Sequence, residues 1–372
     1  MPVTPTLTAS PSAGPDAQGI LDAMCDGGYE QVVHCHDAST GLRSIIAIHD
    51  TTLGPALGGV RMWPYEDGAA ALRDCLRLAR GMTYKAAAAG VNLGGGKSVI
   101  IGDPRRDKSE ALMRAHGRFV QTLGGRYIPG IDVGTDMADL EAIAVEAEHV
   151  SCVRGDPSPM TALGVFEGIR ACLAAARGTD DLAGVRVCVQ GAGHVGTALA
   201  ELLREQAAEL LIADVDGARA RALATRLGGR AIDAAAATAT ACDVLAPCAM
   251  GAVVDDASLP ALRCAIVAGA ANNVLAAPEH GEALHERGIL YAPDFCINAG
   301  GLIFLEEEML GHDPVRTERR VRRVGQLVRD VLARAELDGT SPARAADALA
   351  RERLASLRRV GPATLGHLTR RA

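Results

Sequence analysis

The chain is poor in aromatic residues, lacks paired cysteines and has no long apolar run, and each absence excludes a class of protein. Aromatic residues make up 3% of the 372 residues, and the formal net charge is −7. A nucleic-acid partner would need stacking platforms and a basic surface, so we expect none. The ten cysteines include no Cys-x-x-Cys pair, so we expect no metal site and a reduced, cytoplasmic protein. No segment has the pattern of a signal peptide or a membrane span, so we expect no membrane partner.

The length suits two domains of ordinary size, and 48% of the residues are hydrophobic. Residues 1–18 are rich in Pro, Ser, Thr, Ala and Gly, which predicts a disordered tail. Beyond them, apolar strands alternate with helical patterns, which predicts the α/β class. The segment Val153–Pro159 contains prolines and a glycine, and we take it to divide a substrate-binding domain (19–152) from a nucleotide-binding domain (153–315). An Arg-rich amphipathic helix follows, and we expect residues 316–372 to pack back on the first domain.

A glycine-rich turn is the clearest ligand motif of the second half. Gly191, Gly193 and Gly196 follow the strand Val185–Gln190 and open a helix, and Asp214 ends the next strand. In this Rossmann arrangement the glycines permit a tight turn, admit a pyrophosphate and let the helix pack on a doubly wound parallel sheet. Asp214 can bind a ribose 2′-hydroxyl and would repel a 2′-phosphate, so we expect NAD as the cofactor. A glycine-rich turn without a ligand is the alternative. The residues expected at the cofactor are Gly191, Gly193, His194, Val195, Gly196, Asp214 and Ala246.

Two lysines twelve positions apart are the most informative feature of the first half. Lys85 and Lys97 flank an almost uncharged stretch, and three glycines precede Lys97. A lysine has an ordinary pKa near ~10.4, which burial or a second ammonium lowers. In an apolar pocket, one lysine can stay charged and bind an anion while the other loses its proton and does acid–base work. A P-loop is the first alternative, but its upstream glycine is absent. Two surface lysines are the second, and spacing alone does not decide between them and a catalytic pair.

Several other residues have two interpretations each. His34 and His36 alternate along one strand and could bind a metal, but we expect a solvated strand face. The acidic run 306–308 is expected to be a solvated helix turn, and Trp63 a core residue. Cys248 lies near the expected nicotinamide end of the cleft, and we expect it to pack there instead of reacting.

Longer motifs in one order along the chain carry a family resemblance. They are LGPALGGVRMW (53–63), GMTYK (81–85), NLGGGK (92–97), DVGT (132–135), APCAMG (246–251), GAANN (269–273), YAPDF (291–295) and NAGG (298–301). From about Tyr29 to about Leu357, the chain resembles the leucine/phenylalanine/valine branch of the glutamate dehydrogenase superfamily. The resemblance implies reversible, NAD-dependent oxidative deamination of an L-amino acid to a 2-oxo acid and ammonia. It also implies a homo-oligomer, either a dimer or an octamer.

The resemblance assigns roles to residues by motif position. It implies that Lys85 holds the substrate carboxylate, that Lys97 is the general base and that Asp132 shuttles protons and stabilises the cationic amine and imine. It further implies that two glycines close on the substrate, that one asparagine contacts the nicotinamide ribose or the substrate amine, and that a second faces the cleft. These residues are Gly58, Gly59, Asn273 and Asn298. Either asparagine could instead cap a loop.

The implied side-chain pocket is apolar. A glutamate enzyme would need a cation there, so we expect an apolar substrate side chain. The residues are Leu57, Gly130, Ile131, Leu302 and Leu305. Gly130 and Leu302 resemble the pair in phenylalanine and tryptophan enzymes, which favours an aromatic substrate; a branched-chain substrate such as leucine or valine is the alternative.

Two rival functions remain at this point. A 2-hydroxy-acid dehydrogenase would also bind NAD, but it usually needs a histidine base, and no histidine here lies in a matching motif. A non-catalytic NAD-binding sensor is the second rival. The presence of Lys85, Lys97 and Asp132 together argues against it.

Overall fold

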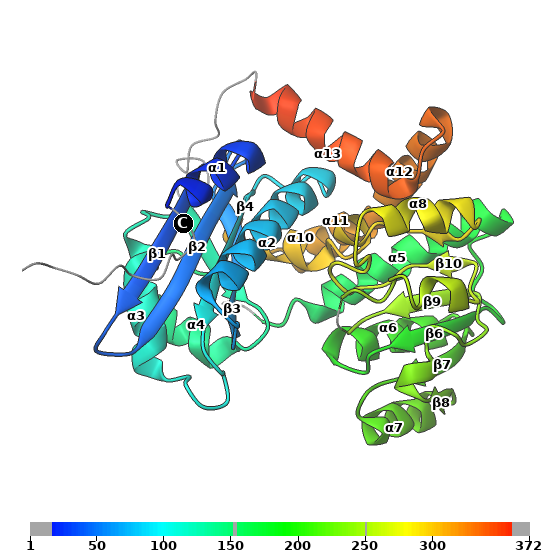
Figure 1. Ribbon diagram of the computed structural model, residues 1–372. Coiled ribbons are helices and arrows are strands. Elements are labelled where there is room, and N and C mark those ends of the chain that lie inside the picture. The colour runs from blue at the N-terminus through cyan, green and yellow to red at the C-terminus, as the bar shows by residue number, and fades with distance from the viewer. Residues whose placement is uncertain (1–16, 152–154, 250, 359–372) are drawn as a thin grey trace, which may run out of the picture.

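The computed structural model describes residues 17–151, 155–249 and 251–358, and in them two α/β units lie side by side (Figure 1). Each unit is built around one sheet, as the sequence predicts. Residues 1–16 of the expected tail, and Val153 and Arg154 of the expected connection, lie outside the described residues. The predicted boundaries of the units stay predictions.

The first sheet has five strands in the order β1-β2-β4-β3-β5. The pairs β1–β2 and β2–β4 are antiparallel, whereas β3 is parallel to both β4 and β5. The strands are β1 (Gln31–Asp37), β2 (Leu42–Asp50), β3 (Ala56–Trp63), β4 (Gly94–Ile101) and β5 (Tyr127–Ile131). Strand β3 was not expected from the sequence, because its glycines hide the apolar alternation of a strand. It lies between β4 and β5, and so it separates the two expected catalytic residues.

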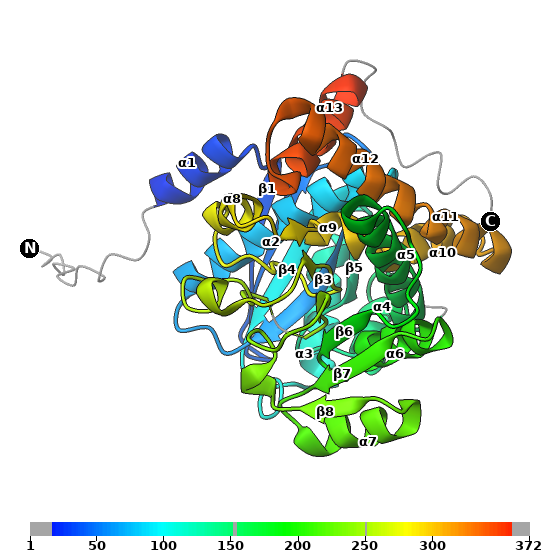
Figure 2. The ribbon, with the colours of Figure 1, turned by 90° about the vertical axis from the view of Figure 1, so that its right-hand side faces the viewer.

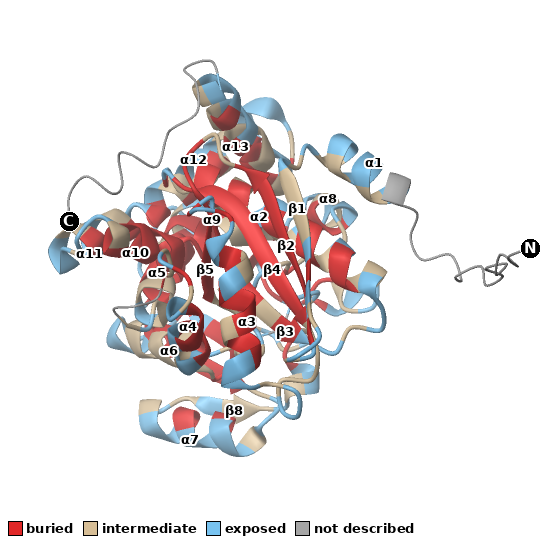
Figure 3. Cartoon of the chain, turned by 90° about the vertical axis from the view of Figure 1, so that its left-hand side faces the viewer, coloured by how far each residue is buried: buried red, intermediate tan, exposed pale blue. Residues whose placement is uncertain are grey.

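Helices cover both faces of this sheet, and the alternation of side chains along β2 decides which residues meet which helix. Ile45 and Ala47 pack with the apolar stripe of α2, whereas Ile46 and Ile48 belong to the core that includes α3. The helices of this unit are α1 (Ala17–Gly27), α2 (Gly68–Ala88), α3 (Glu110–Gln121) and α4 (Met137–Ala144). Figure 3 shows the central strands as the most deeply buried part of the unit.

The second sheet has six strands in the order β11-β10-β9-β6-β7-β8, all parallel. Its order reverses at β6, as in a doubly wound fold, and Figure 2 looks onto this unit. The strands are β6 (Arg186–Gln190), β7 (Glu209–Ala213), β8 (Arg230–Ile232), β9 (Val244–Pro247), β10 (Ile266–Val267) and β11 (Leu290–Tyr291). The helices are α5 (Ser158–Arg177), α6 (His194–Glu205), α7 (Gly217–Leu227) and α8 (Glu279–Glu286), with 3₁₀ turns at Ala234–Ala236 and Leu259–Ala261.

The last helices connect the two units. They are α9 (Asp294–Ile297), α10 (Gly300–Met309), α11 (Pro314–Arg322), α12 (Val324–Asp338) and α13 (Pro342–Arg358). Helix α12 packs on α5, and α13 returns to α2 of the first unit, above the gap between the units in Figure 1. There Arg353 donates to the carbonyl oxygens of Ala86 and Ala87, both at 2.9 Å. The expected return to the first domain is thus confirmed for α13, whereas α11 and α12 pack on α5 of the second unit, and residues 359–372 of the expected segment lie outside the described residues.

Two predictions about burial are wrong. Trp63 is the last residue of β3 and is 44% exposed, so it is not a core residue. Glu306 and Glu307 are buried instead of solvated, because α11 folds back and brings Arg320 into contact with both carboxylates. Their neighbour Glu308 is buried as well.

Candidate active site

A pocket of about 250 Å³ lies between the two units, and it gathers side chains from both. The first unit supplies residues from β3, α2, β4 and β5, and the second supplies the loop after β10 and the start of α10. The lining residues that the sequence predicted are Leu57, Gly59, Lys85, Lys97, Gly130, Ile131, Asp132, Asn273, Leu302 and Leu305. The structure therefore brings the expected substrate and catalytic residues together.

Lys97 and Asp132 form an ion pair across strand β3. Gly59 lies between them in the sheet, and a Cβ atom there would stand 2.6 Å from the Cβ atom of Asp132. The absence of a side chain at Gly59 is what lets the two charged groups meet. Both are well buried, with side-chain exposures of 7% and 15%. Burial raises the pKa of Asp132, but Lys97 and Arg61 outweigh it and hold the pKa at about 2.

The glycines before Lys97 serve helix packing. A Cβ atom on Gly95 would lie 2.1 Å from the Thr83 hydroxyl and 2.6 Å from the Ala79 carbonyl, so α2 rests directly on β4. This close approach fixes the height of α2 above the sheet, and Lys85 lies in the last turns of that helix. The glycine run therefore sets the spacing between the two lysines instead of holding a phosphate.

Lys85 differs from Lys97 in its electrostatic surroundings. Burial is the main cause that lowers the pKa of Lys85, Asp294 and Asp132 oppose it and Lys97 adds to it, and together they place the pKa at about 8. Within the described residues Lys85 forms no direct ion pair. Its ammonium group can therefore take an anionic partner that enters the pocket.

Asp294 reaches the pocket from the second unit, and sequence reasoning assigned no role to it. One carboxylate oxygen accepts from the Val274 backbone N–H at 2.9 Å, and the other from that of Phe295 at 2.7 Å. Asp294 thereby holds the loop that contains Asn273, a non-glycine residue with a φ of 53°. Burial raises the pKa of Asp294 and Lys85 opposes that rise, so the two charges interact across the pocket.

Gly58 and Asn298 lie outside the pocket. A Cβ atom on Gly58 would stand 1.7 Å from the Gly96 carbonyl oxygen, so this glycine permits the contact of β3 with β4. The Asn298 side chain is buried, and its amide nitrogen donates to the Ala270 carbonyl at 3.0 Å and to the Asn272 side chain at 2.8 Å. These contacts fit the loop-capping alternative for Asn298, and its expected place at the cleft stays a prediction.

Arg61 and Asp74 are two further charged residues near the catalytic pair that sequence reasoning missed. The Nε of Arg61 donates to Asp132 Oδ2 at 3.2 Å, and an η nitrogen donates to Asp74 Oδ2 at 2.9 Å. Arg61 stands in the run 53–63 that carries the resemblance, directly after the glycine pair and Val60. Its position two residues beyond Gly59 on a strand is the signal that could have found it.

The nucleotide motif folds as a tight turn from β6 into α6. A Cβ atom on Gly196 would lie 1.9 Å from the Gly191 carbonyl oxygen, whereas one on Gly193 would meet nothing within 4 Å. Helix α6 begins at His194 with no side-chain cap, so the N–H groups of His194 and Val195 are available to an anion. The open side of Gly193 together with these donors fits a pyrophosphate.

Asp214 closes the turn from the neighbouring strand. Its carboxylate oxygens accept from the Ala192 N–H at 2.7 Å and from the Asp216 N–H at 2.8 Å. Each oxygen keeps a further lone pair for a ribose hydroxyl. Ala246 lies beside Val189 of β6 and is fully buried. The residues of this edge therefore fit a dinucleotide.

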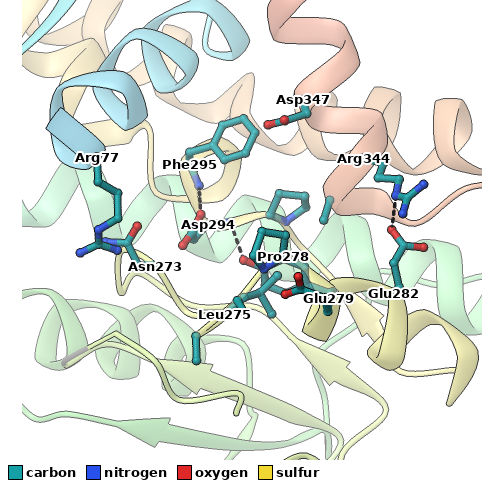
Figure 4. Close-up of a pocket in the computed structure, with 15 residues that line it drawn as sticks. Arg77, Asn273, Leu275, Pro278, Glu279, Glu282, Asp294, Phe295, Arg344 and Asp347 are labelled. Carbon is teal, nitrogen blue, oxygen red and sulfur yellow. Dashed lines mark hydrogen bonds and ion pairs between the residues drawn. The ribbon is translucent and has the colours of Figure 1, made fainter. Parts of the chain in front are cut away.

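A second cavity of about 640 Å³ adjoins the pocket and shares Arg77, Asn273, Asp294 and Phe295 with it. Figure 4 shows these shared residues on one side and the ion pair of Arg344 with Glu282 on the other. Helices α2, α8 and α13 supply much of its wall. The cleft between the units therefore extends beyond the catalytic pocket.

His34, His36 and Cys248, which each had two interpretations in the sequence, do not line the pocket. His34 and His36 are exposed on β1, as a solvated strand face requires, and the described residues hold no cluster of His, Cys, Asp and Glu suited to a metal. Burial raises the pKa of Cys248 to about 12, so its thiol is a poor nucleophile. Among the described helices, none combines the length and the hydropathy that a membrane span needs.

Two family models match the chain. The model for the Glu/Leu/Phe/Val dehydrogenase dimerisation domain matches residues 29–149, and the Glutamate/Leucine/Phenylalanine/Valine dehydrogenase model matches residues 219–359. These matches span both units and more than half of the chain. The chain belongs to the glutamate/leucine/phenylalanine/valine dehydrogenase family. It is an amino-acid dehydrogenase, an oxidoreductase acting on CH–NH₂ groups, in a family that depends on NAD(P).

Relatives in this family differ in substrate. The leucine dehydrogenase of Bacillus subtilis (strain 168) is 48% identical over 337 residues, which cover 89% of this chain and 93% of the relative. The phenylalanine dehydrogenase of Bacillus thermotolerans is 43% identical, with 88% of each chain covered. The crystal structure of L-tryptophan dehydrogenase from Nostoc punctiforme superimposes with a TM-score of 0.80 at 40% identity, covering 91% of this chain and 99% of that one. The expected aromatic preference is not supported, and the branched-chain alternative fits better.

Proposed function

We propose that this family member catalyses the reversible, NAD-dependent oxidative deamination of L-leucine and similar branched-chain L-amino acids. The observation that carries the proposal is the polarity of the pocket. Lys85, Lys97 and Asp132 line it together with the apolar side chains of Leu302 and Leu305. The greater identity to a leucine dehydrogenase than to a phenylalanine dehydrogenase supports the branched-chain substrate.

The apolar lining also argues against a glutamate substrate. A side-chain carboxylate would need a free cation, and the two arginines that line the pocket already bind acids. Arg61 pairs with Asp74 and Asp132, and Arg77 pairs with Asp74. An aliphatic side chain needs no such partner.

In the proposed mechanism the two lysines have separate tasks. Lys85, which has no direct counter-ion in the described part of the chain, binds the substrate carboxylate and thereby orients the α-carbon. Asp132 remains anionic because of its neighbours and stabilises the cationic amine and imine. Lys97 in its neutral form accepts a proton from the water that attacks the imine, and Asp132 passes protons between Lys97 and the leaving nitrogen. The products are the 2-oxo acid and ammonia.

The cofactor is proposed to lie along Gly191, Gly193 and the first turn of α6, with Asp214 at the ribose. NAD, when bound there, supplies the acceptor for the α-hydride of the substrate. The carboxylate of Asp214 would repel a 2′-phosphate, which favours NAD over NADP. Asn273, on the loop that Asp294 holds, lies where it can contact the nicotinamide ribose or the substrate amine.

The test is a panel of L-amino acids assayed for NADH formation at alkaline pH. We expect leucine, isoleucine and valine to have the highest kcat/KM, phenylalanine and tryptophan lower values, and glutamate no measurable rate. A panel without any NADH would overturn the proposed activity, whereas a preference for phenylalanine would overturn only the branched-chain assignment. The same assay with NADP checks the cofactor.

We also propose a cytoplasmic homo-oligomer. The nine described cysteines are unpaired, as in a reducing compartment. The first unit matches a model described as a dimerisation domain, and β1 lies at the edge of its sheet. Light scattering of the purified protein would distinguish a dimer or an octamer from a monomer.

A further inference from the structure

Arg61 joins two carboxylates at the base of the pocket. Through Nε it donates to Asp132 Oδ2 at 3.2 Å, and through an η nitrogen it donates to Asp74 Oδ2 at 2.9 Å. The oxygen of Asp132 that it contacts is the same oxygen that pairs with Lys97. Two cations on one oxygen restrict the rotation of that carboxylate.

Asp74 anchors this arginine from helix α2. The same Oδ2 atom accepts from the Tyr65 hydroxyl at 2.7 Å, and Oδ1 accepts from Arg77 at 2.9 Å. Burial raises the pKa of Tyr65, and so does its bond to Asp74, so the phenol keeps the proton that it donates. Asp74 is therefore held from several sides and cannot follow a movement of Arg61.

The geometry of the guanidinium explains why an arginine stands here. Its donors form a rigid planar fork that can contact two acids at once, which the single ammonium of a lysine does less well. The side chains of Arg61, Asp74 and Asp132 are exposed by 20%, 17% and 15%. In such a partly dry site the interaction is stronger than at the surface.

We propose that Arg61, anchored by Asp74, is a positioning residue that sets the orientation and the charge of Asp132 for the reaction. The proposal rests on the proposed role of Asp132. Arg61 acts through Asp132 and is not assigned any contact with the substrate carboxylate, which belongs to Lys85. Its loss therefore impairs turnover more than substrate binding.

The first experiment compares Arg61→Gln and Arg61→Lys with the wild-type enzyme, using L-leucine and NAD. Removing a residue that orients a metal ligand typically costs about 10- to 100-fold in activity, and we apply the same scale to the residue that orients Asp132. We expect a fall of this size in kcat for Arg61→Gln, with KM for leucine changed less than about threefold because Lys85 is untouched. Arg61→Lys keeps the positive charge but not the planar fork of donors, so its kcat should lie between those of Arg61→Gln and the wild-type enzyme.

Arg118→Gln is the matched control. This arginine lies on α3 of the same unit, pairs with Asp37 at 3.1 Å and with Glu146 at 3.7 Å, and does not line the pocket. It should change kcat by less than about twofold, as expected for a largely exposed ion pair. An equal loss of kcat in Arg118→Gln would mean that any broken ion pair has the same effect, and would overturn the proposal.

Asp74→Asn is a second test of the positioning role, which can be used if Arg61→Gln folds poorly. It leaves Arg61 in place but weakens its anchor, and we expect a smaller fall in kcat. Because both changes act through Asp132, the double variant should be no slower than Arg61→Gln alone, whereas independent defects would multiply. Multiplying effects, an unchanged kcat in Arg61→Gln, or a KM effect as large as the kcat effect would each refute the positioning role. An inactive wild-type enzyme would instead refute the proposed function.

Discussion

Lys85 and Lys97 enter the same pocket from a helix and from a strand, and their surroundings differ. Lys97 lies in the sheet and is paired with Asp132, whereas Lys85 stands in the last turns of α2 and has no direct counter-ion among the described residues. The lowered pKa falls on Lys85, the lysine proposed to bind the substrate carboxylate. Spacing alone left a catalytic pair and two surface lysines both open, and for the pair it did not say which lysine would lose its proton easily.

The difference indicates how a substrate would change each lysine. A carboxylate arriving at Lys85 supplies the missing counter-ion, so binding restores the proton and the charge of that group. Lys97 already has a counter-ion in Asp132, so a substrate carboxylate supplies no missing charge there. Substrate binding therefore changes the charge of Lys85, whereas Lys97 is paired with Asp132 beforehand. The predictions below alter one of these lysines or its surroundings, and the last one leaves both unchanged.

The largest effect is expected for Lys97→Ala. General acid–base residues contribute roughly 10²- to 10⁴-fold, so kcat should fall by at least about 10³-fold in steady-state assays with leucine. Lys108→Ala is the matched control, because it removes the third lysine of the chain, which pairs with Asp136 and Asp139 outside the pocket. A Lys97→Ala enzyme with a tenth of the wild-type kcat would contradict the proposed base.

Gly59→Ala tests the contact between Lys97 and Asp132 without removing either charge. The added Cβ atom would stand 2.6 Å from the Asp132 Cβ atom and 2.7 Å from the Ile131 carbonyl oxygen, so the aspartate must move. A misplacement of about 1 Å can cost roughly 10²-fold, and we expect kcat/KM to fall by about that factor. Gly68→Ala, with nothing within 4 Å of the new atom, should behave like the wild type. Equal activity of the two variants would show that Gly59 has no such role.

The pH dependence of KM should report on Lys85 alone, with a smaller effect than the two substitutions above. With a pKa of about 8 in the free pocket, Lys85 is charged below that pH and neutral above it. The KM for 4-methyl-2-oxopentanoate, which has no amine of its own to titrate, should be constant below about pH 8 and rise about tenfold per unit above it. Lys85→Arg keeps its charge over this range, so its KM should not rise. The same rise in that variant would assign the titration to another group.

Substituting Asp294 is a second test of the titration of Lys85. Its charge raises the pKa of Lys85, so Asp294→Asn should lower that pKa and move the rise in KM to a lower pH. A profile that stays in place would show that Asp294 acts only on its loop, through the N–H groups of Val274 and Phe295.

The sequence predicted those parts of the site that depend on residues close together in one motif. The turn at Gly191 and the pair Lys85 and Lys97 lie in short motifs, and family position added Asp132. The contacts of Asn298 could not be predicted from its motif, because its partners, Ala270 and Asn272, lie in a loop whose path depends on the second sheet. Contacts between distant segments are not visible in a motif.

Ion pairs between residues far apart in the chain show most clearly what could not be predicted from the sequence. Arg61 and Asp132 are 71 positions apart and meet only because β3 and β5 are neighbours. Glu306 looks like a surface residue in sequence, yet it accepts from the Asn92 N–H at 2.6 Å and pairs with Arg320 once α11 has folded back. The charge pattern could have suggested this, since an arginine-rich helix follows the acidic run.

The smallest effect concerns the apolar end of the pocket. Leu305 is 9% exposed and lines the pocket from α10, so Leu305→Ala should admit a larger side chain. A difference of this size is worth about 1–3 kcal/mol, and we expect the ratio of kcat/KM for phenylalanine over leucine to rise about tenfold. Leu310→Ala, at the exposed end of the same helix, is the control and should leave the ratio unchanged. Because neither lysine is touched, KM for the carboxylate-bearing 2-oxo acid should keep its dependence on pH in both variants; a shifted pH profile would mean that the two ends of the pocket are coupled.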